Sequence, residues 1–77
     1  MNKIIIDLYI PSIDETYNIF IPINKKVGTI KNTIINSIKN LTEGNYKFLL
    51  LNTGVIIDDN IYVKNSGIVN GSRLILL

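Results

Sequence analysis

The chain has 77 residues, of which 47% are hydrophobic, and its eight Lys and Arg against six Asp and Glu give a formal net charge of +2. This length allows one domain, residues 1–77, with a small core that has to bury its apolar side chains efficiently. Because the sequence has no Cys and no His, it lacks thiolate ligands, the commonest metal ligand and the commonest general base, so we expect no metal, no cofactor and no enzyme activity.

The first segment, residues 3–10, has the two-residue period of a strand with one buried face. Its regularly spaced apolar side chains are Ile4, Ile6, Leu8 and Ile10, and Pro11 ends the pattern. Asp7 interrupts the apolar run, so the segment predicts neither a signal peptide nor a membrane span. We therefore expect a cytoplasmic protein without direct membrane insertion.

The same period returns after a polar corner at residues 12–15. The apolar side of this second predicted strand consists of Tyr17, Ile19, Ile21 and Ile23. Two neighbouring strands joined by so short a connection predict an antiparallel hairpin.

The period then changes to that of a helix. Its apolar stripe consists of Ile30, Ile34, Ile38 and Leu41, spaced at i, i+4, i+8 and i+11. Thr29 is the predicted N-cap and Gly44 the predicted stop. Lys31 and Lys39 fall on the other side, so we expect an amphipathic helix of about three turns that lies across one face of a sheet.

The remaining residues predict strands again. Residues 47–51 form a third strand and residues 55–57 a short return strand, with a turn at Asn52-Thr53-Gly54 between them. Asp58-Asp59-Asn60 is predicted to be a solvated corner, and residues 72–77 are the last strand. Two glycines, Gly67 and Gly71, stand in the turns before this strand.

The spacing Val63-x-x-x-Gly67-Ile68-x-x-Gly71-x-x-Leu74-x-Leu76 resembles the end of ubiquitin-like β-grasp domains. The resemblance covers essentially the whole chain. It implies an α+β fold, ββαββ(β), in which one helix packs across one face of a mixed sheet. The segment 67–77 is most similar to the bacterial YukD group, also called EsaB-like, which is associated with type VII secretion. Ser72 and Ile75 replace the acidic and polar residues that are usual in that group.

The resemblance also implies a test for conjugation. Ubiquitin-type modifiers and sulfur carriers use a C-terminal Gly-Gly that is adenylated and transferred, and the chain contains no Gly-Gly pair and ends at Leu77. We therefore expect a protein-interaction module that is not conjugated. By resemblance, it is an accessory or regulator of type VII secretion, with a component of that system as a possible partner.

Strand alternation predicts which side chains face away from the helix. The predicted partner-binding patch consists of Ile5, Leu49, Leu51, Arg73, Ile75 and Leu77, which should be neighbours in the β-grasp strand order. Three readings of this patch stay open. It binds another protein, it joins two copies of the chain in a homodimeric structural or assembly role unrelated to secretion, or loops partly cover it.

Other chemistry has little support in the sequence. The neighbouring carboxylates Asp58 and Asp59 lie in a polar corner, so we do not expect them to work as an acid-base pair. Lys25-Lys26 is the only basic pair, and the four tyrosines fall on different elements. We therefore expect no binding of nucleic acid.

Overall fold

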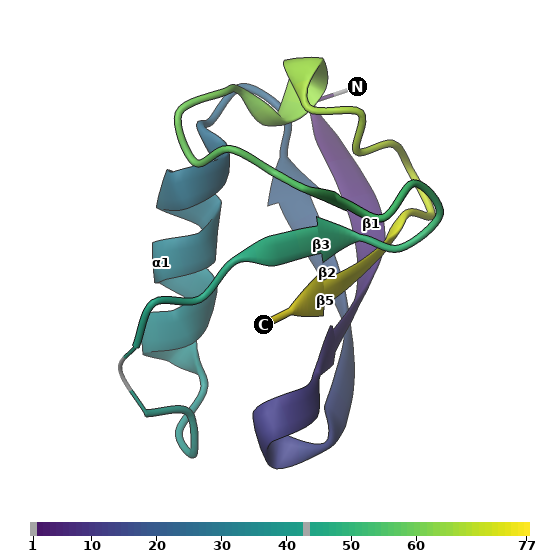
Figure 1. The fold of residues 1–77 in the computed structure, drawn as a ribbon. Coiled ribbons are helices and arrows are strands. Elements are labelled where there is room, and N and C mark those ends of the chain that lie inside the picture. Colours follow the sequence, from purple (N-terminus) through teal and green to yellow (C-terminus); the bar gives the residue numbers. More distant parts are fainter. Residues whose placement is uncertain (1, 43) are drawn as a thin grey trace.

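The computed structural model describes residues 2–42 and 44–77, which form one mixed sheet with one α-helix on one of its faces (Figure 1). The elements in chain order are β1 (Lys3–Ile10), η1 (Pro11–Ile13), β2 (Glu15–Pro22), α1 (Val27–Ser37), β3 (Phe48–Leu50), β4 (Val55–Ile56), η2 (Val63–Asn65) and β5 (Arg73–Leu76), where η marks a short 3-10 turn. The sheet order is β2-β1-β5-β3-β4. Only β1 and β5 are parallel among the paired strands of the described residues. The predicted order of strands and helix is confirmed.

The predicted hairpin is confirmed and is the longest strand pair. Every residue of β1 pairs with one of β2, from Lys3 opposite Pro22 to Ile10 opposite Glu15. The connection is the 3-10 turn η1 followed by Asp14, which has the left-handed φ of 52°. β2 begins at Glu15, the last residue of the predicted polar corner, so the strand starts one residue earlier than predicted.

The core agrees with the predicted alternation in part. Val27, Ile57, Val63 and Ile68 are buried without having been predicted, whereas Ile4, Tyr17, Ile19, Ile23, Ile38 and Leu41 are only partly buried. The buried hydrophobic side chains of the core come from β1, β2, β3 and β5, from α1, and from the segment between β4 and β5. They are Ile6, Leu8, Ile10, Ile21, Val27, Ile30, Ile34, Phe48, Leu50, Ile57, Val63, Ile68, Leu74 and Leu76. Burying each of them contributes about 1.5–3 kcal/mol of gross driving force.

The predicted N-cap of the helix is wrong. The helix begins at Val27, two residues before Thr29, and has no side-chain cap. Instead, the amides of Val27 and Gly28 donate to the carbonyls of Ile61 and Asp59, each at 2.9 Å. These acceptors satisfy donors that are unpaired at every helix start, and they come from a distant part of the chain that local sequence patterns do not reveal.

The predicted end of the helix is also wrong, because α1 stops at Ser37 and not near Gly44. The hydroxyls of Thr33 and Ser37 donate to the carbonyls four residues before them, at 3.0 and 2.7 Å. Such bonds compete with the helical ladder, and Asn, Ser and Thr have weak helix propensity. Leu41 lies beyond the helix but still packs partly against the core. No helix of the described residues is long and apolar enough to cross a membrane.

Asn70 and Gly71 fix the parallel pairing of β1 with β5. The amide of Ile5 donates to Oδ1 of Asn70 at 2.9 Å, and the amide of Gly71 donates to the carbonyl of Ile5 at 2.8 Å. The side chain of Asn70 thus accepts the hydrogen bond that a strand carbonyl would accept if β5 extended further toward its N-terminus. Gly71 has a φ of 87°, which favours glycine.

Candidate functional site

The face of the sheet opposite α1 carries a row of apolar side chains across four strands. Tyr9 is the register partner of Ile75 on β5, Ile75 of Leu49 on β3, and Leu49 of Ile56 on β4. Side chains directly opposite one another on a sheet face touch, so these four form one continuous strip. Tyr9 and Ile56 are exposed, whereas Ile75 and Leu49 are half-buried.

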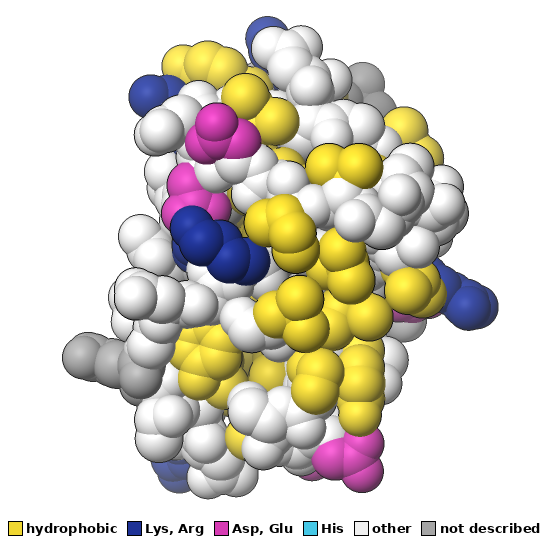
Figure 2. Space-filling model, viewed as in Figure 1, with side chains coloured by type: hydrophobic (Ala, Val, Ile, Leu, Met, Phe, Trp, Pro, Cys, Tyr) yellow, Lys and Arg dark blue, Asp and Glu magenta, His cyan; other side chains and the backbone are white. Residues whose placement is uncertain are grey.

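Two exposed leucines extend this strip at β3 and β5. Leu51 donates its amide to the carbonyl of Arg73 at 3.0 Å, and Leu77 exchanges two backbone hydrogen bonds with Lys47. Leu51 is 48% exposed and Leu77 is 52% exposed. We call the six side chains the outer patch: Tyr9, Leu49, Leu51, Ile56, Ile75 and Leu77. Figure 2 shows hydrophobic side chains gathered in a band over the region where Figure 1 draws β3 and β5.

The prediction that Ile5 neighbours this patch is wrong. Ile5 lies opposite Phe20 on β2, and its carbonyl accepts from the amide of Gly71. The polar pair Asp7 and Arg73, which are register partners, separates Ile5 from the strip. The reason is the register between β1 and β5, which brings Tyr9 and not Ile5 beside Ile75. Strand alternation already places Tyr9 on the outward face, so the register of β1 against β5 alone decides that Tyr9, and not Ile5, lies beside Ile75.

Polar groups border the outer patch. Arg73, with its side chain 74% exposed, has Nε 3.8 Å from Oδ2 of Asp7, and Asn18 donates to Oδ1 of the same carboxylate at 2.7 Å. An exposed ion pair of this kind contributes little to stability, so Arg73 remains available to a partner. The Tyr9 hydroxyl donates to Oδ1 of Asp14 at 2.9 Å, and this hydrogen bond raises the pKa of Tyr9.

The predicted solvated corner at Asp58-Asp59 is only partly correct. Asp58 is exposed, and its Oδ1 accepts from the amide of Asn60 at 2.8 Å. Asp59 instead binds Lys31, whose Nζ lies 2.6 Å from Oδ2 of Asp59 and donates to the carbonyl of Tyr46 at 2.8 Å. The two carboxylates therefore bind different groups, Asp58 a backbone amide and Asp59 a lysine ammonium.

Lys31 was expected on the solvent side of the helix and is buried, with 7% of its surface exposed. Its ammonium joins α1 to the segment before β3 and to the loop after β4. We call this ion pair the Lys31–Asp59 clasp. The clasp links parts of the fold to one another. It lies away from the sheet face that carries the outer patch and is not part of that surface.

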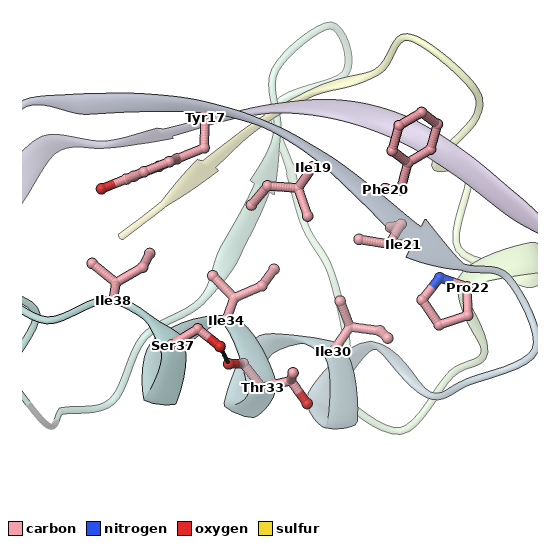
Figure 3. Close-up of a pocket in the computed structure, with 10 residues that line it drawn as sticks. All are labelled: Tyr17, Ile19, Phe20, Ile21, Pro22, Ile30, Thr33, Ile34, Ser37 and Ile38. Carbon is pink, nitrogen blue, oxygen red and sulfur yellow. Dashed lines mark hydrogen bonds between the residues drawn. The ribbon is translucent and has the colours of Figure 1, made fainter.

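A groove that the sequence did not indicate lies between β2 and α1. This groove has a volume of about 370 Å³. Its apolar lining comes from Tyr17, Ile19 and Ile21 on one side and from Ile30, Ile34 and Ile38 on the other. Figure 3 shows these side chains pointing toward one another, with Phe20 directed away.

No protein-family model and no curated protein matches the chain. Among solved structures, it is similar to the ubiquitin-like domain of the Arabidopsis thaliana protein At2g32350, with a TM-score of 0.78, 18% identity and coverage of 100% of this chain and 78% of that one. It is also similar to a chain from a structure described as molecular mimicry of SUMO that promotes DNA repair, with a TM-score of 0.84, 16% identity and coverage of 100% and 92%.

A third similar chain comes from the MycP5-free ESX-5 inner membrane complex, with a TM-score of 0.79 and 9% identity. All of this chain matches, but only 21% of the other one does. At these identities the similarity establishes the fold, which is the ubiquitin-like β-grasp fold. The predicted fold class is therefore confirmed.

Proposed function

We propose that the chain is a non-catalytic ubiquitin-like module that binds a protein partner through the outer patch. The observation that carries the proposal is the strip from Tyr9 to Ile56, where aligned apolar side chains lie on the sheet face that α1 leaves uncovered. Contiguous exposed apolar surface on a small domain is typical of an interface. Lys47 and Arg73 at its border favour a partner with acidic groups around an apolar centre.

The proposed setting is a bacterial cytoplasm, where the module is an accessory or regulator of type VII secretion. Two observations support it. The segment 67–77 resembles the YukD group, and the whole chain is similar in fold to a part, 21%, of a chain in the MycP5-free ESX-5 inner membrane complex.

Affinity capture from the native host's lysate tests the binding proposal. We expect the wild-type chain to retain a specific partner that Leu51→Asp and Ile56→Asp fail to retain, because a carboxylate in an apolar interface loses its hydration without gaining a cation. Tyr62→Asp is the control, since Tyr62 is 42% exposed and lies in the loop after β4, outside the patch. The proposal is wrong if all variants retain the same proteins, and the secretion setting is wrong if the retained partner belongs to no secretion system.

The alternative reading, a homodimer built on the outer patch, is tested with the same variants. Light scattering would then show a dimer for the wild-type chain and a monomer for Leu51→Asp. A mass that does not respond to Leu51→Asp excludes this form of self-association.

A further inference from the structure

β2 is an edge strand with open hydrogen-bonding groups along one side. It stands at the end of the sheet order, next to β1 only. The amide of Ile23 donates to the carbonyl of Asn2, which shows that odd-numbered residues of this strand bond toward β1. In an antiparallel pair the bonding direction alternates with every residue. The amides and carbonyls of Thr16, Asn18 and Phe20 therefore point away from the sheet.

The chain limits this open edge at both ends. Asp14 leaves the strand conformation, with a φ of 52°, and Pro22 has no amide to donate. Three residues with free groups remain between these limits, and Asn18 is the central one. An antiparallel partner with the same three residues fits in a single register that uses all of them: Asn18 faces Asn18, and Thr16 faces Phe20. The open edge of β2 is thus complementary to itself.

The side chains and charges agree with this register. The residues between the rungs, Tyr17 and Ile19, would face each other across the junction as a close pair, and their side chains line the groove under β2 (Figure 3). A second copy running in the opposite direction brings the acidic end of each β2, at Asp14 and Glu15, toward the basic turn of the other. That turn, which follows β2, carries Lys25-Lys26.

We propose that a second copy of this chain pairs with β2 across a two-fold axis at Asn18. The two sheets then continue into one another, and the groove between β2 and α1 is closed by Tyr17 of the other copy. Because a two-fold axis between antiparallel strands is perpendicular to the sheet, both outer patches face the same side. The pairing uses a different surface from the proposed partner-binding function and does not depend on it.

Sedimentation and light scattering across a concentration series from about 10 µM to about 1 mM, which detects dissociation constants in the micromolar to millimolar range, test the proposal. We expect the apparent mass to rise from 8.7 kDa toward twice that value. Residue 18 is exposed, meets its own copy at the axis and lies beside Asp7 of its own chain. Asn18→Asp adds a second carboxylate there and should remain at 8.7 kDa, whereas Asn18→Lys, whose charge Asp7 partly offsets, should weaken association less. An equal mixture of the two variants should recover the dimer, because opposite charges then face each other. Asn52→Lys and Asn52→Asp, exposed in the turn before β4, are the matched controls and should associate like the wild type.

Circular dichroism establishes that each variant is folded. A second measurement needs no variant: amide hydrogen exchange of Thr16, Asn18 and Phe20 should slow as the wild-type concentration rises, while the other exposed amides stay unchanged. A wild-type chain that is monomeric at 1 mM overturns the proposal. So does a dimer that is indifferent to both charges at residue 18, or one that the mixture of the two variants fails to restore.

Discussion

Replacing Lys31 by Met tests whether the Lys31–Asp59 clasp holds α1 to the second half of the sheet. The methionine keeps most of the buried stem and removes only the ammonium. The Asp59 carboxylate then loses its cation at 2.6 Å, and the Tyr46 carbonyl loses a donor at 2.8 Å. The other carboxylate oxygen, Oδ1 of Asp59, is already buried without a partner in the described part of the chain. Of the two carboxylate oxygens of Asp59, only Oδ2 can therefore be hydrated after Lys31 is replaced.

Removing one member of a fully buried ion pair costs about 3–5 kcal/mol. The clasp is not fully buried, because the side chain of Lys31 is 9% exposed and that of Asp59 is 34% exposed. We therefore expect Lys31→Met to lower the free energy of unfolding by about 3 kcal/mol, the lower end of that range. For a domain of this size, the loss corresponds to a decrease of the melting temperature by roughly 12–24 °C.

Urea unfolding followed by circular dichroism measures this loss, with Lys39→Met as the control on an exposed lysine just beyond the helix. The control should change stability by less than about 0.5 kcal/mol. The double variant Lys31→Met/Asp59→Asn should be more stable than Lys31→Met alone, because it removes the uncompensated carboxylate. If Lys31→Met and Lys39→Met are equally stable, the clasp contributes nothing net and the reasoning is refuted.

Three further predictions follow from single contacts. Asn70→Ala should lower the free energy of unfolding by about 1 kcal/mol, because the amide of Ile5 in β1 loses its hydrogen-bond acceptor. Asn65→Ala, at an exposed position, is the control and should leave the free energy of unfolding almost unchanged; urea unfolding compares the two variants. Gly67→Ala should lower the free energy of unfolding by about 1–2 kcal/mol in the same assay, because the left-handed φ of 88° strains any residue with a Cβ. The added Cβ itself meets only ordinary van der Waals contacts, so the loss reports on the backbone, and an unchanged stability would contradict the left-handed turn. Asp14→Asn, which suits the left-handed conformation, should lower the pKa of Tyr9 toward its usual value in an ultraviolet titration. Because folding raises the pKa of Tyr9, the protonated hydroxyl stabilises the folded state fully below the unfolded-state pKa of about 10. This stabilisation is lost as the pH rises through the folded-state pKa. A Tyr9 titration that Asp14→Asn leaves unchanged would show that the hydrogen bond to Asp14 is not the cause of the shift.

The parts of the fold that depend on neighbouring residues were predictable. The two-residue period of β1 and β2, the apolar stripe of α1 and the glycine turns before β5 all act within a few residues of the chain. The same alternation correctly placed Phe48 and Leu50 inward and Leu49 and Leu51 toward the other face.

The parts that failed depend on contacts between distant residues. The start of α1 is set by carbonyls more than thirty positions later, so local sequence patterns predict Thr29 as the N-cap, whereas Lys26 occupies that position. Lys31 was assigned to solvent because a lone lysine on a helix gives no sign of a carboxylate that folds onto it. The register of β1 against β5 follows from the bonds of Asn70 and Gly71, and without it Ile5 was placed in the patch instead of Tyr9.

The two edges of the sheet differ in a way that bears on self-association. An open strand edge is a template for pairing with another chain, and proteins protect such edges by shortness, charge or proline. β4 has only two residues, so its edge offers too little backbone for a stable partner. β2 has eight residues, and its protection by Asp14 and Pro22 reaches only the ends. Because no charged side chain stands between Thr16 and Phe20, the middle of β2 is the one stretch of strand edge in the described residues where length and chemistry both permit pairing. The charge substitutions at Asn18 supply the protection that this stretch lacks, which is why they test self-association more directly than any change in the groove.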